Sequence, residues 1–120
     1  MERVSGTDRQ DLYETVLAAI DRERNTILDI ADQIHARPEL SMQEHFACDL
    51  LATTMERYDF AVERGAGGVE TAFKARMRGR SAGPAIAFLA EYDALPGLGH
   101  GCGHNLIAGS NLAAAIGLSA

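Results

Sequence analysis

An uncharged stretch at the C-terminal end of the sequence most strongly limits how this chain can fold. Residues 94–120 contain no Asp, Glu, Lys or Arg, although such residues make up 23% of the 120-residue sequence. A stretch of this kind must be buried against other parts of a protein, because large exposed apolar surfaces promote association. No apolar run reaches the roughly 20 residues that a membrane span needs. We therefore expect part of a larger globular protein rather than a small complete domain.

The charged residues are distributed unevenly, and their pattern excludes several classes of partner. Residues 1–59 hold 13 acidic and 6 basic residues, whereas residues 60–120 hold 4 acidic and 5 basic residues. Scattered basic residues in a chain of net charge −6 argue against nucleic-acid binding, which needs clustered Lys or Arg. The charged N-terminus lacks the apolar stretch of a signal peptide. Two cysteines form no disulfide scaffold, so we expect a reducing, cytoplasmic location, with a Cys48–Cys102 disulfide as the open alternative.

Two helices are predicted in the first half of the chain. The first starts near Thr7 or Asp8, which are good N-cap residues, and ends near His35. The second begins at Ser41, which with Glu44 has the form of a capping box. Apolar residues follow a helical period in both helices. Those of the first are Leu12, Val16, Ile20, Ile27, Ile30 or Ala31, and Ile34, and the face of the second is Ala47, Leu50, Leu51, Thr54 and Tyr58.

The pattern then changes to that of strands. Residues 60–63 and 69–77 alternate in polarity, on either side of a glycine turn, as half-buried strands do. Residues 85–90 are continuously apolar and predict a central strand buried on both faces. After a glycine-rich loop, Asn105 is expected to cap a last helix over residues 106–118, buried against the sheet. The fold class is therefore α/β, with two helices, three strands, a loop and a buried helix in layers.

Side chains suited to catalysis or metal binding cluster just after the predicted central strand. Glu91 and Asp93 lie two residues apart, so in extended backbone both carboxylates point to the same side. Cys102 and His104 repeat this spacing, with glycines on either side, and thiolate and imidazole together suit zinc and related ions. The carboxyl ends of strands are where ligands bind in α/β sheets. The cluster therefore predicts a metal or catalytic site.

Each of these residues also has an ordinary structural explanation. Alone, Cys102 would be a small buried residue, His104 an inert hydrogen-bonded one, and Asp93 a turn former. A nucleophilic Cys102 beside His104 is conceivable, although the spacing suits two ligands of a third atom better. The glycines of the loop do not complete a dinucleotide-binding motif, and Lys74, the single lysine, lies in a predicted strand rather than in a phosphate-binding loop.

The sequence resembles a known family of metallohydrolases. Residues 90–108 read Ala-Glu-Tyr-Asp-Ala-Leu-Pro-Gly-Leu-Gly-His-Gly-Cys-Gly-His-Asn-Leu-Ile-Ala. This run is similar to the amidohydrolase branch of the aminoacylase/carboxypeptidase family, close to its dipeptidase and aminobenzoyl-glutamate hydrolase members. The resemblance continues upstream. The family's first junction between helices is similar to residues 35–44, and its first pair of strands is similar to residues 60–68 and 71–75. The resemblance implies that residues 1–120 are the N-terminal portion of the family's layered catalytic domain.

The resemblance also implies a reaction and roles for individual residues. It implies a dinuclear centre of divalent metal ions that hydrolyses an amide or peptide bond with metal-activated water. Cys102 and His104 match metal ligands, and Asp93 matches an acid that orients the site. The remaining candidates for residues that line the site are Glu91, His100 and Asn105. Zinc is the metal expected from thiolate and imidazole, with manganese or cobalt as alternatives.

The resemblance finally implies what lies outside this sequence. The family's general base, further ligands and lid or dimerisation domain are expected beyond residue 120, so we expect the isolated chain to be an inactive fragment. The family suggests small substrates, namely dipeptides, N-acyl amino acids or aminobenzoyl-glutamate-like amides, and a homodimer for the full-length protein. The alternatives are a non-catalytic module that binds a metal or a partner, and a purely structural fragment.

Overall fold

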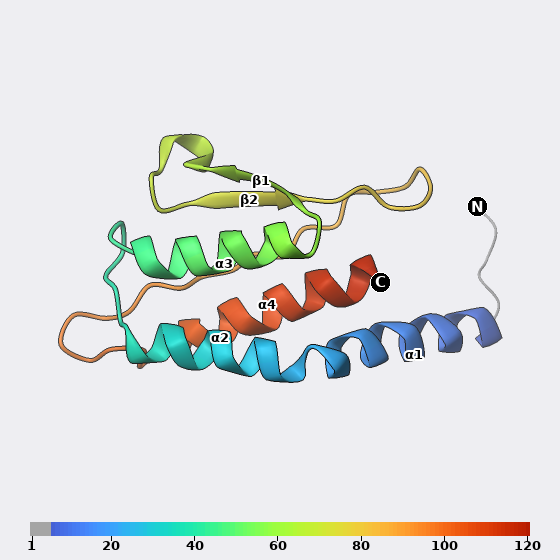
Figure 1. Cartoon of the computed structure of the whole chain (residues 1–120), viewed down its shortest axis with the longest axis horizontal. Coiled ribbons are helices and arrows are strands. Elements are labelled where there is room, and N and C mark those ends of the chain that lie inside the picture. Colours follow the sequence, from blue (N-terminus) through green and yellow to red (C-terminus); the bar gives the residue numbers. More distant parts are fainter. Residues whose placement is uncertain (1–5) are drawn as a thin grey trace.

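The computed structural model describes residues 6–120 and confirms the α/β fold class. Figure 1 shows α1 and α2 end to end along one side, α4 between them and α3, and a β-hairpin over the other side of α3. The two strands are antiparallel, with Val62 opposite Ala75. In chain order the elements are α1 (Gly6–Arg22), α2 (Arg24–Ala36), α3 (His45–Arg57), β1 (Ala61–Arg64), the 3-10 helix η1 (Ala66–Gly68), β2 (Phe73–Arg76) and α4 (His104–Ser119).

The first predicted helix is two helices with a break at Glu23. Glu23 has φ −95° and ψ 7°, and its carboxylate accepts a hydrogen bond from the Tyr58 hydroxyl at the end of α3. This partner is distant in sequence, so the helical period could not reveal the break. The end of α2 at Ala36 agrees with the prediction. α1 begins at Gly6, near the predicted start at Thr7 or Asp8, and its N-cap position lies outside the described residues.

The predicted capping box at the start of the second helix was wrong. α3 begins at His45, and Glu44 occupies its N-cap position without a capping hydrogen bond from its side chain. Glu39 caps the helix instead: its carboxylate accepts the backbone N–H groups of Phe46 at 2.9 Å and Ala47 at 2.8 Å. A negative charge at a helix N-terminus also interacts favourably with the helix dipole.

Substitution of Glu39 tests this assignment. Glu39→Ala is expected to lower the free energy of unfolding by about 1–2 kcal/mol, because two N–H groups of the first turn lose their acceptor. Urea denaturation followed by circular dichroism measures the loss. The matched control is Glu63→Ala on the exposed side of β1, for which we expect a change within about 0.5 kcal/mol. Equal losses in the two variants would contradict the capping role.

The core lies between α2, α3 and α4. Ile34 and Leu51 are fully buried, and they pack with Leu112 and Ile116 of α4 in one apolar cluster. α4 therefore packs mainly against helices, not against a sheet as predicted. Asn105 does not cap α4 either: Gly103, at a positive φ of 73°, is the N-cap residue. The Asn105 side-chain amide instead donates to the Ala31 carbonyl oxygen at 3.2 Å and ties α4 to α2.

The predicted central strand is not formed. Residues 85–90 carry no strand assignment, and the side chains of Ile86 and Leu89 are 62% and 81% exposed. A central strand needs a hydrogen-bonded neighbour on each edge, and in the described part of the chain β2 pairs with β1 alone. Within residues 6–120, residues 85–90 thus lack the two neighbouring strands that a central strand needs. Over the same residues, no helix has the length and apolar character of a membrane span.

Candidate functional site

The candidate site lies where the segment after residues 85–90 meets the N-terminus of α4. A parallel bridge pairs Ala94 with Leu40, and the Ala94 N–H donates to the Glu39 carbonyl oxygen at 2.7 Å. This contact anchors the segment to the loop before α3, the same loop from which Glu39 caps that helix. Gly103 then turns the chain into α4, so that His104 is the first residue of the helix. These local features fix the positions of the functional side chains.

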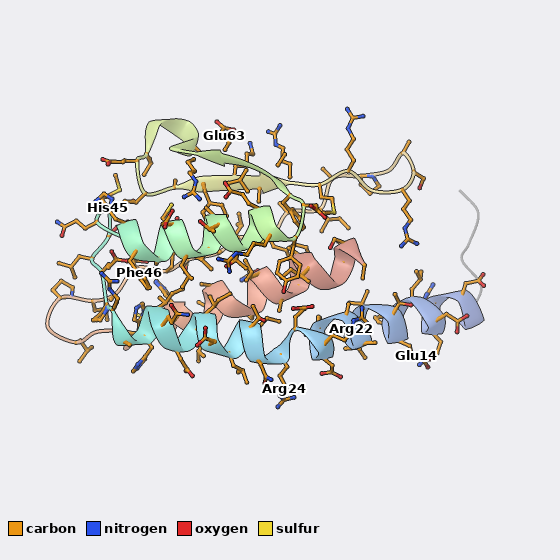
Figure 2. All side chains as sticks on the ribbon, viewed as in Figure 1. Glu14, Arg22, Arg24, His45, Phe46 and Glu63 are labelled. Carbon is orange, nitrogen blue, oxygen red and sulfur yellow. The ribbon has the colours of Figure 1, made fainter. Side chains whose placement is uncertain are left out.

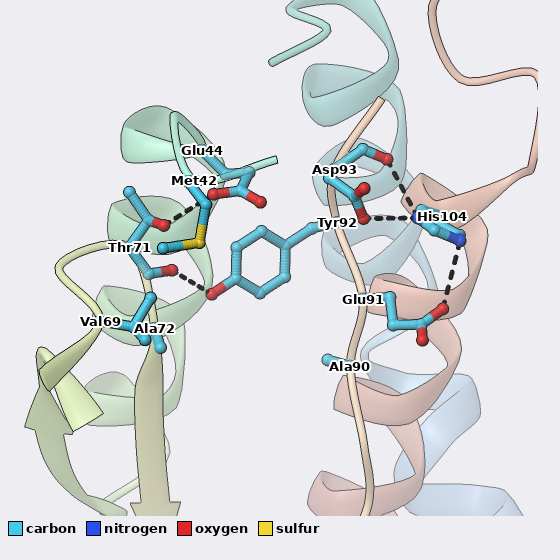
Figure 3. A pocket seen from close by; sticks show the side chains of 10 residues that line it. All are labelled: Met42, Glu44, Val69, Thr71, Ala72, Ala90, Glu91, Tyr92, Asp93 and His104. Carbon is cyan, nitrogen blue, oxygen red and sulfur yellow. Dashed lines mark hydrogen bonds and ion pairs between the residues drawn. The ribbon is translucent and has the colours of Figure 1, made fainter. Parts of the chain in front are cut away.

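His104 lies between two carboxylates, as Figure 3 shows. Its Nδ1 is 2.7 Å from Asp93 Oδ1 and 3.1 Å from the Asp93 backbone oxygen, and its Nε2 is 3.2 Å from Glu91 Oε2. The His104 side chain is 22% exposed, whereas that of Glu91 is 60% exposed. The expectation that Glu91 and Asp93 face one side of an extended segment is therefore confirmed, and His104 is the residue on which they converge.

The contacts of Asp93 indicate that Nδ1 of the His104 ring carries a hydrogen. Nδ1 has two oxygen acceptors within hydrogen-bond distance, both from Asp93, so Nδ1 carries a hydrogen and donates. In a neutral imidazole the other nitrogen, Nε2, then presents its lone pair. A carboxylate that holds one ring nitrogen in this way is the usual partner of a histidine that binds a metal ion through the other.

Cys102 lies apart from these contacts. Its side chain is exposed and its thiol is free, in the turn that precedes α4. Cys48 is also free and is buried, so the alternative of a disulfide between the two was wrong. Among residues 6–120, no group of three or more His, Cys, Asp or Glu side chains is placed to hold a metal ion. The pairing of Cys102 with His104 as ligands stays a prediction.

The other two candidate residues do not line the cavity beside His104. Both ring nitrogens of His100 are buried without a hydrogen-bond partner, and its ring centroid is 6.2 Å from that of His35. Burial lowers the pKa of the His100 imidazole. A neutral His100 therefore packs the loop against the end of α2. Asn105 is committed to its hydrogen bond with α2.

A cavity of about 330 Å³ opens beside the site and has polar groups that the sequence did not reveal. Glu44 is buried and accepts a hydrogen bond from the Thr71 hydroxyl at 2.6 Å, and the Tyr92 hydroxyl donates to the Thr71 carbonyl oxygen at 2.5 Å. The only sequence signal for this network was the position of Tyr92 between two candidate acids. The lining residues are Met42, Glu44, Val69, Thr71, Ala72, Ala90, Glu91, Tyr92, Asp93 and His104 (Figure 3).

The buried thiol of Cys48 and the partly buried hydroxyl of Tyr92 predict a loss of stability in alkali. Burial raises the pKa of the Cys48 thiol, and burial together with the neighbouring Cys48 raises that of the Tyr92 hydroxyl. Above a pH of about 8.5 the unfolded chain releases the thiol proton while the folded chain retains it. The folded state then binds more protons, so stability falls as pH rises. Urea unfolding between about pH 8 and 10 should show this fall, and it should be shallower in Cys48→Ala.

Comparison with known proteins relates this fold and site to hydrolases of amide and peptide bonds. The chain is 38% identical over 125 residues to a subunit of p-aminobenzoyl-glutamate hydrolase of Escherichia coli (strain K12), in an alignment that covers 89% of the chain and 25% of that protein. It is 42% identical over 125 residues to Xaa-Arg dipeptidase of Mus musculus, in an alignment that covers 97% of the chain and 29% of that protein. It is 32% identical over 109 residues to thermostable carboxypeptidase 2 of Saccharolobus solfataricus (strain ATCC 35092 / DSM 1617 / JCM 11322 / P2). This alignment covers 79% of the chain and 28% of that protein.

These relatives confirm the predicted resemblance to the amidohydrolase branch of the aminoacylase/carboxypeptidase family. No family profile matches the chain. The chain spans roughly a quarter of the length of the relatives that it matches. The similarity therefore concerns one part of each of these hydrolases.

Proposed function

We propose that this chain forms the N-terminal portion of the catalytic domain of a metal-dependent hydrolase of amide or peptide bonds. The observation that supports it most directly is the hydrogen bond of 2.7 Å between Asp93 Oδ1 and His104 Nδ1. In the neutral ring it leaves the lone pair on Nε2, the nitrogen that faces Glu91, beside a cavity that His104, Glu91 and Asp93 line. The relatives named as hydrolase, dipeptidase and carboxypeptidase support the reaction class.

The donor set around His104 suits one side of a centre for divalent metal ions. His104 would bind through Nε2, Asp93 would hold the ring in position, and Cys102 would contribute its thiolate from the neighbouring turn. Zinc is the ion that imidazole and thiolate favour, with manganese or cobalt as alternatives, and two ions are proposed for the full-length protein. When bound, such ions polarise the carbonyl group of the substrate and make bound water acidic enough to act as a nucleophile at neutral pH.

The names of the relatives support a proposal for the substrate class. Small amides are proposed, namely dipeptides, N-acyl amino acids or aminobenzoyl-glutamate-like molecules, since the relatives are named for p-aminobenzoyl-glutamate and Xaa-Arg. The cavity of about 330 Å³ is within the size range of small-molecule sites. One relative is named as a subunit, which supports assembly with further chains, and a homodimer is the form we propose for the full-length protein. The two free cysteines support a reducing, cytoplasmic location.

The isolated 120-residue chain is proposed to bind a metal ion without hydrolysing substrate. Residues 6–120 form no group of three or more metal-binding side chains, and a catalytic zinc usually has three protein ligands. The proposed general base and further ligands lie in the parts of the relatives that this chain does not match. A non-catalytic module that binds a partner is the second candidate, and the exposed apolar side chains of Ile86, Phe88 and Leu89 favour it.

Two measurements test the proposal. A longer protein that contains this sequence should hydrolyse a dipeptide or aminobenzoyl-glutamate with Zn²⁺ or Mn²⁺, and chelation or His104→Ala should abolish the activity. The 120-residue chain alone should bind Zn²⁺ and show no turnover with the same substrates. Hydrolysis that survives chelation, or that is unchanged in His104→Ala, would contradict the proposed function, and turnover by the isolated chain would contradict its assignment as an inactive part.

A further inference from the structure

The segment that carries Glu91 and Asp93 is not held in place by a sheet. In the described part of the chain, no backbone–backbone hydrogen bond involves residues 85–93, and the next one along the chain joins the Ala94 N–H to the Glu39 carbonyl oxygen. A paired strand fixes the direction of its side chains through such bonds along its length. The positions of the two carboxylates must therefore depend on Ala94 and on side-chain contacts of the segment itself.

Tyr92 makes such contacts on the side of the segment opposite to the carboxylates, as alternation in extended backbone requires. In Figure 3 its ring points towards Thr71, whereas the two carboxylates point towards His104. Its hydroxyl donates to the Thr71 carbonyl oxygen at 2.5 Å, and its ring stacks on Phe73 at a centroid distance of 6.3 Å. Burial raises the pKa of this hydroxyl, so it keeps its hydrogen at neutral pH and remains a donor.

The groups that Tyr92 contacts are themselves fixed. The Thr71 hydroxyl donates to the buried Glu44 at 2.6 Å, which ties this loop to the residue before α3. Phe73 begins β2, and the β-hairpin packs on α3, with side chains in the space between them (Figure 2). α3 in turn contributes to the apolar core. The hydrogen bond of Tyr92 therefore connects the segment of the two carboxylates to the core of the protein.

We propose that Tyr92 is a positioning residue, whose hydroxyl holds the two neighbouring carboxylates in contact with His104. Its importance for hydrolysis rests on the proposed function, whereas the positioning itself concerns contacts within this chain. Asp93 is next to Ala94, which has its own backbone hydrogen bond, and Glu91 is not. The 3.2 Å contact of Glu91 should therefore depend on the tyrosine more strongly than the 2.7 Å contact of Asp93 does.

The test removes one hydroxyl group at a time. Tyr92→Phe keeps the ring that stacks on Phe73 and removes the donor to Thr71. Tyr58→Phe is the matched control, because the Tyr58 hydroxyl also bonds a residue distant in sequence but does not line the cavity. In NMR spectra of the 120-residue chain, the ring signals of His104 should shift in Tyr92→Phe and stay unchanged in Tyr58→Phe. A general loss of stability would instead affect the two variants alike.

A double substitution separates positioning from stability. Tyr92→Phe is expected to weaken Zn²⁺ binding by roughly three- to tenfold, less than the loss of a direct partner of the metal-binding histidine, because it acts through such partners. In a chain that already carries Asp93→Asn, the same change should weaken binding by less than about twofold, since the contact through which it acts is lost. Calorimetric titration of the four chains near neutral pH measures these affinities.

Each outcome decides the role of Tyr92. Ring signals of His104 that move equally in Tyr92→Phe and Tyr58→Phe, or that move in neither, would overturn the positioning role and leave the proposed function intact. Fully additive losses of Zn²⁺ affinity in the double variant would also overturn it, because Tyr92 would then act independently of Asp93. Absence of Zn²⁺ binding by the original chain would contradict the proposed function, and the NMR comparison would still decide whether Tyr92 positions the carboxylates.

Discussion

Leu51→Ala is expected to lower the free energy of unfolding by about 3 kcal/mol, the largest effect on stability among the substitutions considered. Leu51 is 0% exposed and lies in the middle of α3, where it packs in the cluster that joins α3 to α2 and α4. Truncation removes buried methyl groups and leaves a cavity that neighbouring helices fill only in part. Because α3 also supports the β-hairpin, the loss should affect the whole unit rather than one helix.

Urea denaturation followed by circular dichroism measures this loss. Leu28→Ala is the matched control, because Leu28 is also in a helix but is 53% exposed, and its substitution should cost under about 1 kcal/mol. A similar loss in both variants would show that helix propensity rather than burial dominates. A cost for Leu51→Ala below about 1 kcal/mol would contradict the assignment of the core to the interface of α2, α3 and α4.

The helices were predictable from the sequence because the information for them is local. The apolar residues recur at the helical period, and Ile34, Leu51 and Ala47 of these predicted faces are indeed buried. The helix breaks and caps were not predictable in the same way. Glu23 is held by Tyr58 across 35 positions in sequence, and Glu39 reaches over its own loop to cap α3. Such contacts depend on tertiary structure, which the period of a single helix does not contain.

For residues 85–90, the sequence pattern predicted a strand that the structure does not contain. Their continuous apolar character predicts a strand buried on both faces, yet the side chains of Ile86 and Leu89 are exposed in the described structure. Burial of a strand depends on its neighbours, and β1 and β2 form the one sheet among residues 6–120. The apolar pattern therefore indicates burial between neighbouring strands, and residues 6–120 do not supply those strands.

Part of the candidate site was predictable and part was not. The spacing of Glu91 and Asp93 correctly placed both carboxylates on one side, because alternation is a property of extended backbone. That they converge on His104 depends on the loop that brings α4 back to this segment, and no local rule gives its path. The same limit applies to Glu44 and Thr71, whose hydrogen bond joins positions 27 residues apart.

Asp93→Asn is expected to weaken Zn²⁺ binding by the 120-residue chain by roughly 10- to 100-fold, although Asp93 itself does not contact the ion in the proposed site. Asp93 accepts from His104 Nδ1 at 2.7 Å and so keeps the lone pair on Nε2. An asparagine loses the negative charge, and its amide nitrogen can donate to Nδ1, which moves the ring hydrogen to Nε2. The nitrogen that faces the cavity would then have no lone pair to offer.

Calorimetric titration with Zn²⁺ and nitrogen NMR of the His104 ring together test this role. We expect the NMR spectrum of the original chain to show a hydrogen on Nδ1 and that of Asp93→Asn to show a larger share on Nε2. Asp32→Asn, an exposed position on α2, controls for the loss of one negative charge. If Asp93→Asn lowers Zn²⁺ affinity no more than Asp32→Asn does, then the short hydrogen bond to His104 stabilises the fold without orienting a ligand. A shifted ring hydrogen with unchanged affinity would show that Zn²⁺ binds elsewhere, since a site that uses Nε2 depends on its lone pair.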